Sequence, residues 1–159
     1  MLNSKSEYPI SGYLILVNSD RLMKYIAIFL FASFALAANA QKSIPSKSEV
    51  DAVMQNAVKK TNAQMSGSRV DEYTTLRFLT YDVNPPLLSY FYATSVMRDT
   101  NQNSLSQSQI DAIRNFNVNK SCAAYGIIMK HYNLRVAHIF DDSYTGKPIH
   151  KITVSHMDC

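Results

Sequence analysis

The sequence predicts an α+β domain in which an antiparallel sheet of about four strands carries helices on one face. Three observations predict it. Segments with apolar residues at helical spacing alternate with segments rich in Thr, Tyr, Phe, Leu and Val, in the order helix, two strands, helix, two strands. Turn-forming residues separate the strands of each pair, which favours hairpins. Two cysteines in a chain with an export signal add one disulfide.

Residues 23–40 have the three parts of a bacterial secretory signal. Lys24 supplies the positive charge, an uncharged apolar run follows, and Ala-Asn-Ala at 38–40 fits a signal-peptidase site. The apolar run is shorter than the roughly 20 residues that span a bilayer, so we expect cleavage rather than a membrane anchor. We interpret residues 1–22 as a start-site overcall or a leader extension. Residues 41–159 then form a single domain that is periplasmic or secreted.

The first predicted helix begins at a capping box, because Ser46 and Glu49 stand three residues apart. An apolar stripe follows at helical intervals, formed by Val50, Val53, Met54, Ala57 and Val58. We expect this stripe to face the core. The Ser-Gly-Ser sequence at 66–68 should end the helix.

Residues 71–83 and 87–99 have the composition of strands, and the two prolines between them favour an antiparallel hairpin. Regular alternation along the first strand puts Thr74, Leu76, Phe78 and Thr80 on one face and Tyr73, Arg77 and Tyr81 on the other. Along the second segment, Leu88, Tyr90, Tyr92 and Val96 alternate with Ser89, Phe91, Ala93 and Ser95. Because both faces carry aromatic residues, we expect one face to pack on helices and the other to leave tyrosines at the surface.

These tyrosines are the candidate binding residues, since tyrosine is enriched in recognition surfaces. The candidates are Tyr73, Tyr81, Tyr90 and Tyr92. Strands also use tyrosine for cross-strand packing alone, so a purely structural role is the alternative.

A polar loop leads into a second helical region that Ser106 or Ser108 can cap. Residues 117–122 are poor helix material, so we expect a kink or break there, before a short helix over 123–131. The last unit is a second hairpin. Its inward residues are Leu134, Val136, His138 and Phe140 on the first strand, with Ile152 and Val154 on the second.

Two cysteines in an exported domain usually pair, so we expect a bridge between Cys122 and Cys159. This bridge would close a loop of about 38 residues. A redox site usually has a Cys-x-x-Cys pair or a thiolate at a helix N-terminus, whereas these two cysteines lie 37 residues apart. A metal site would recruit His150 and His156 with Cys159, but strand geometry separates the two imidazoles by about 20 Å. We therefore expect a structural disulfide, and neither a metal nor another cofactor.

The sequence lacks the catalytic templates G-x-S-x-G and H-E-x-x-H and a phosphate-binding glycine loop, so we expect a non-enzyme. The formal charge is +4 and no basic run exceeds the pair at 59–60, which excludes nucleic acid as the expected partner. We expect no membrane association after signal cleavage. These observations favour an exported module that binds another envelope or secreted protein. The alternative is an inhibitor of a hydrolase or an envelope-stress accessory protein.

The run from "DEYTTL" through "SCAAY" to the closing "HMDC" resembles a group of small exported proteins of Gram-negative bacteria, mostly uncharacterised. One related set is provisionally labelled as quorum-sensing-regulated virulence factors. The matching residues are Asp71, Thr74, Leu76, Tyr90, Tyr92, Cys122, Asp158 and Cys159. This chain departs from the group in carrying His138 where an aromatic residue is usual, and in a longer "DDSYTGK" turn. The resemblance implies a fold and a disulfide, and no known activity.

Overall fold

The computed structural model describes residues 44–99 and 104–159. Its elements are α2 (Lys47–Met65), β1 (Thr74–Val83), β2 (Pro86–Thr94), α3 (Val96–Asp99), α4 (Gln107–Tyr132), β3 (Arg135–Asp142), β4 (Pro148–Val154) and the 3-10 helix η1 (His156–Asp158). The predicted order of helix, two strands, helix, two strands is confirmed, with the short helices α3 and η1 added. The predicted leader 1–22 and signal 23–40 lie outside the described residues.

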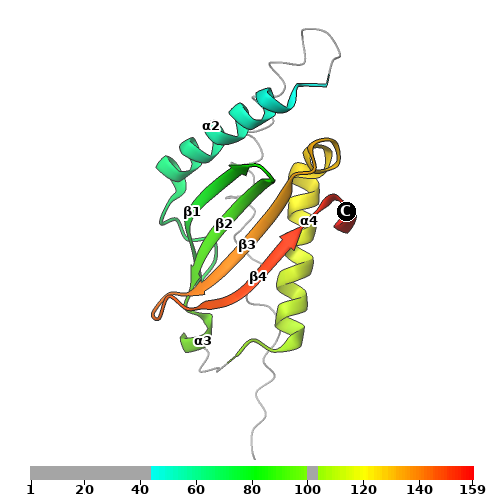
Figure 1. Ribbon diagram of the computed structural model, residues 1–159. Coiled ribbons are helices and arrows are strands. Elements are labelled where there is room, and N and C mark those ends of the chain that lie inside the picture. Colours follow the sequence, from blue (N-terminus) through cyan, green and yellow to red (C-terminus); the bar gives the residue numbers. More distant parts are fainter. Residues whose placement is uncertain (1–43, 100–103) are drawn as a thin grey trace, which may run out of the picture.

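The four strands form one sheet in the order β1-β2-β3-β4 (Figure 1). The β1–β2 and β3–β4 pairs are antiparallel, as predicted, whereas the central pair β2–β3 is parallel. The parallel pair follows from α4, which carries the chain from the end of β2 back to the start of β3. The sheet is therefore mostly rather than wholly antiparallel.

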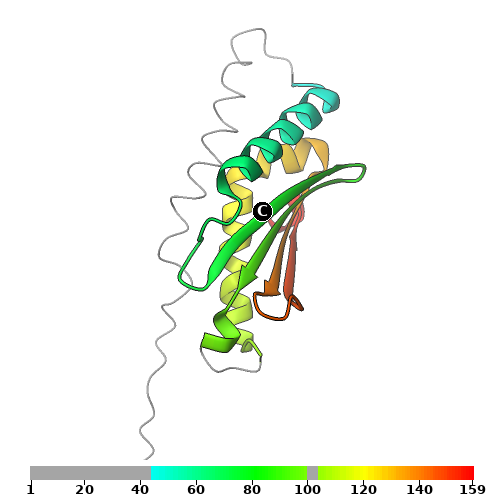
Figure 2. The ribbon, with the colours of Figure 1, turned by 90° about the vertical axis from the view of Figure 1, so that its left-hand side faces the viewer.

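Both long helices lie against the same face of the sheet, and the opposite face has no described helix over it (Figure 2). α2 begins at the predicted capping box, in which Ser46 accepts from the amide of Glu49 and Glu49 accepts from the amide of Ser46. Its Val50 and Met54 are buried in the core, which confirms the predicted stripe.

A β-bulge at Arg77 changes which residues of β1 face the core. Leu76 pairs with Tyr92 and Phe78 pairs with Phe91, so Arg77 is the extra residue. Beyond the bulge, Leu79 rather than Phe78 points inward, and Phe78 is 37% exposed. The prediction that Leu76, Phe78 and Thr80 share one face is therefore wrong, because it assumed an uninterrupted alternation.

α4 is one continuous helix of 26 residues, so the predicted break at 117–122 is also wrong. Its inner stripe is Ile113, Asn117, Ser121, Tyr125 and Met129. The Asn117 amide donates to the carbonyl of Ile113 at 2.8 Å, and Ser121 has a hydrogen-bond partner in the sheet. Because these polar residues are satisfied in the core, their low helix propensity does not interrupt the helix.

Candidate functional site

The structure separates the four predicted binding tyrosines. Tyr90 and Tyr92 are 1% and 6% exposed, so the prediction that they lie at a surface is wrong. Both residues point from β2 toward the helices, into the hydrophobic core. β2 itself is a central strand, with β1 on one side and β3 on the other. Tyr81 is partly buried and donates to the Asp51 carboxylate on α2, and burial together with that carboxylate raises its pKa. Tyr73 is half-buried in the loop before β1.

The two buried tyrosines belong to a polar cluster between the sheet and α4, which we call the tyrosine–histidine cluster. Its members are Tyr90, Tyr92, Ser121, Tyr125 and His138. The hydroxyls of Tyr90 and Tyr125 hydrogen-bond to each other. The ring nitrogens of His138 lie 3.3 Å from the Tyr92 hydroxyl (Nδ1) and 3.0 Å from the Ser121 hydroxyl (Nε2).

The strand register stacks the rings of this cluster. Tyr90 stands opposite His138, and Tyr92 stands opposite Phe140, across the parallel β2–β3 pair. The paired rings are nearly parallel, with centroids 5.1 Å apart for Tyr90 and His138 and 4.9 Å apart for Tyr92 and Phe140. The stack fills the centre of the sheet with aromatic area while its polar atoms point to partners.

Burial sets the protonation states in the cluster. It lowers the pKa of His138 to about 3, and it raises the pKa of Tyr125 to about 12 against an opposing hydrogen bond from Tyr90. At neutral pH the imidazole is therefore uncharged, with one N–H donor and one acceptor nitrogen. Both neighbouring hydroxyls can donate or accept, so either tautomer leaves both ring nitrogens satisfied.

The contact between Ser121 and His138 has the distance expected of a nucleophile and its base. Both side chains are 0% exposed, so neither faces the solvent in this structure. The other histidines lie elsewhere, His131 at the end of α4, His150 on β4 and His156 in η1. The geometry thus gives the pair a packing role.

Sequence reasoning placed His138 inward but did not find its partners. Ser121 and Tyr125 stand four residues apart on α4, the spacing of one helix face. That spacing was the available signal, and the predicted break at 117–122 concealed it.

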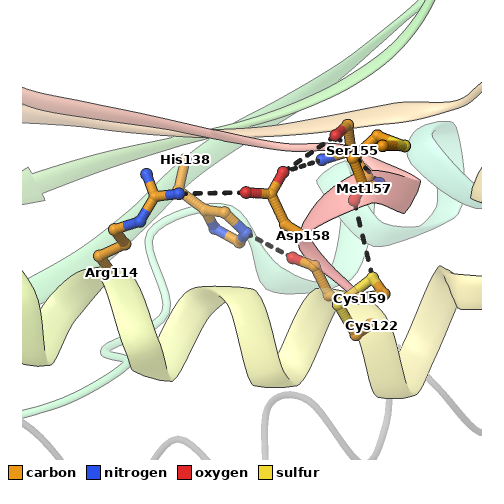
Figure 3. The surroundings of a disulfide bond; sticks show 8 residues. Arg114, Cys122, His138, Ser155, Met157, Asp158 and Cys159 are labelled. Carbon is orange, nitrogen blue, oxygen red and sulfur yellow. Dashed lines mark hydrogen bonds and ion pairs between the residues drawn. A yellow bond between two sulfur atoms is a disulfide. The ribbon is translucent and has the colours of Figure 1, made fainter.

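The predicted disulfide is present and holds the C-terminus on α4 (Figure 3). The Cα atoms of Cys122 and Cys159 are 5.5 Å apart. Beside the bridge, the Arg114 guanidinium lies 3.1 Å from the Asp158 carboxylate. Hydrogen bonds from the backbone and hydroxyl of Ser155 hold the pKa of that carboxyl below its usual range. Residues 156–159 are therefore fixed to α4 by one covalent link at Cys159 and one ion pair at Asp158.

The uncovered face of the sheet carries an apolar row, which we call the open-face row. It consists of Phe78, Phe91 and Ile139, one from each of β1, β2 and β3, and the strand register continues it to Lys151 on β4. Phe78 and Phe91 stack with centroids 4.4 Å apart. Arg77 spans the same face to reach the Asp141 carboxylate at 3.7 Å.

The described residues contain no group of three or more His, Cys, Asp or Glu side chains that could hold a metal ion. Across the same residues, 44–99 and 104–159, none of the helices combines the length and the apolar character needed to cross a bilayer.

No protein-family model matches the chain, and no curated protein matches it significantly. Two solved structures share its fold. One is a Pseudomonas aeruginosa protein provisionally assigned as secreted, 13% identical, with a TM-score of 0.56 over 74% of this chain and 99% of that one. The other is the pilotin EpsS of the Vibrio vulnificus type 2 secretion system, 11% identical, with a TM-score of 0.53 over 71% of this chain and 94% of that one. At these identities the similarity establishes the fold alone.

Proposed function

We propose that this chain is an exported, non-catalytic protein-binding module of the bacterial envelope. The open-face row carries the proposal. Phe78 and Phe91 stack on each other on a face of the sheet that no described helix covers. Phe78 is exposed and Phe91 is partly buried beneath it. Aromatic side chains at a surface, beside fixed charges, are typical of protein-recognition surfaces.

Two further observations support this proposal. The histidine that contacts a serine lies deep in the core, which favours a packing role over a catalytic one. The two structural neighbours include a component of a secretion system and a protein provisionally assigned as secreted, in agreement with the export signal of this sequence. The partner that fits the row is a protein segment with an apolar side chain for the Phe pair and an acidic group for Lys151.

Site-specific photo-crosslinking in the producing cells tests the proposal. A crosslinking amino acid replaces Thr80 or Thr153, which flank the open-face row, and Lys60 on the exposed side of α2 serves as the control position. We expect one discrete adduct in the envelope fraction from the first two positions and none from the third. Phe78→Ser combined with Phe91→Ser should remove that adduct. Equal crosslinking from all three positions, or none from the open face, would contradict the proposal.

A further inference from the structure

The two edges of the sheet are treated differently. Along β1, backbone groups of 67–70 bond to those of Thr74 and Leu76, and Gly67 donates to the Leu76 carbonyl at 2.8 Å. The Asn62 side chain makes two bonds to the backbone of Leu79, at 2.9 and 2.7 Å. Ser66 donates to the Arg77 carbonyl. The edge of β1 from Thr74 to Leu79 is thus occupied by the end of α2 and the loop that follows it.

β4 has no such cover within the part of the chain that the structure describes. It is the last strand of the sheet and pairs only with β3 (Figure 1). Of residues 44–99 and 104–159, none outside β3 makes a hydrogen bond to the backbone between Ile149 and Thr153. Alternate residues of an edge strand direct their N–H and C=O groups outward, so β4 presents a row of backbone groups that no other described residue pairs.

The charges along this edge specify what would pair with it. Lys147 and Lys151 are exposed, and neither lies within ion-pair distance of a described carboxylate. Two nearby acidic side chains are in ion pairs: Asp141 with Arg77, and Asp158 with Arg114. Asp142 lies beside Lys147, where its carboxylate accepts from the amides of Tyr144 and Thr145. Along β4 itself, the charge of Lys151 is therefore not paired with a carboxylate of the described residues.

This charge pattern opposes a second copy of the chain as the occupant. Lys151 is the middle residue of β4, so two copies paired antiparallel about that residue would bring the two lysines opposite each other. Like charges directly opposite on neighbouring strands are destabilising, whereas opposite charges there stabilise the pair.

We propose that β4 is the site at which an extended, acidic segment of a partner protein adds a fifth strand to the sheet. This inference rests on the proposed binding function and specifies strand addition as the way in which the partner binds. The added segment would place a Glu or Asp opposite Lys151 and a β-branched residue opposite Ile152, which faces the helix side of the sheet. The added acidic residue would also extend the open-face row, so one partner could contact both.

Amide hydrogen exchange followed by NMR tests this mode of binding on the intact domain 41–159. The probes are two capped seven-residue peptides in which Val alternates with Glu or with Lys. With the Glu peptide we expect alternate amides of β4 to gain protection, while amides of β1 do not change. Lys151→Glu should weaken binding of the Glu peptide by about fivefold and improve that of the Lys peptide, since one cross-strand pair changes from opposite to like charge. Lys60→Glu on α2 is the matched control and should change neither.

The outcomes separate the two proposals. If the Glu peptide leaves all β4 amides unchanged, or if Lys151→Glu and Lys60→Glu weaken it equally, strand addition is refuted, whereas the crosslinks from Thr80 and Thr153 still decide the binding function. An equal gain in protection at inward and outward β4 amides, or a peptide-independent dimer, would also refute it, since neither is the signature of an acidic strand added at this edge.

Discussion

Acidification should destabilise the domain through His138. The imidazole is fully buried and its pKa is lowered to about 3, whereas an imidazole in the unfolded chain titrates near 6.5. Between these two values the unfolded chain binds a proton that the folded chain does not. The stability contributed by the neutral imidazole is therefore complete above pH 6.5 and is lost as the pH falls toward 3.

The magnitude follows from the linkage relation. Each pH unit within this window lowers the free energy of unfolding by at most about 1.4 kcal/mol, so the step from pH 7.5 to pH 5 removes about 2 kcal/mol. That step stays above the range in which unfolded carboxyls titrate, near pH 4. The lowered pKa values of Glu49 and Asp158 therefore contribute little to it.

Urea unfolding at pH 7.5 and pH 5 measures the effect, followed by far-ultraviolet circular dichroism because the chain has no tryptophan. His138→Gln keeps a polar group near Ser121 but does not titrate, so its unfolding free energy should lose about 2 kcal/mol less between the two pH values. His150→Gln, on the neighbouring strand, is the matched control and should behave as the parent. A parent difference below about 0.5 kcal/mol, or an unchanged pH dependence in His138→Gln, would refute the reasoning.

Two further outcomes follow from the structure and one from the sequence. Replacing Cys122 and Cys159 by Ser should lower the free energy of unfolding by about 4 kcal/mol, the chain-entropy value for this loop, and a loss below about 1 kcal/mol in the same urea assay would contradict it. Tyr90→Phe should lower the free energy of unfolding by about 1–3 kcal/mol, because it leaves the buried Tyr125 hydroxyl without its partner. Replacing both Tyr90 and Tyr125 by Phe should lower it by less than the sum of the two single replacements. N-terminal sequencing of the exported protein should begin at Gln41, and any sequence from the leader would contradict signal cleavage.

Local signals in the sequence predicted much of this fold. The Ser46–Glu49 spacing located the start of α2, and the same Ser-x-x-Gln spacing from Ser106 is a capping box at the start of α4. The disulfide was predictable because the predicted export signal indicates an oxidising compartment, in which two distant cysteines usually pair. Each of these inferences depends on a few neighbouring residues or on the compartment, so none of them requires knowledge of tertiary contacts.

The bulge of β1 could not be predicted in the same way. Leu76, Phe78 and Leu79 are all apolar, so the pattern of the strand permits the inward face to change after Leu76 or to continue. The contacts that accompany the bulge come from outside the strand. Ser66 bonds to the Arg77 carbonyl, and Asn62 bonds to both backbone groups of Leu79. An inference from alternation alone has no access to these contacts.

The bulge also explains why the aromatic residues lie where they do. It turns Phe78 outward to stack on Phe91, while Tyr90 and Tyr92 remain under the helices. Composition suggests the reverse, because phenylalanine has no polar atom to hydrate and tyrosine has one. A buried tyrosine is tolerated when its hydroxyl has a partner, and Tyr90 has one in Tyr125. No comparable contact inside the domain accounts for the outward position of the phenylalanine pair. We therefore place recognition on the open face and not at the tyrosines.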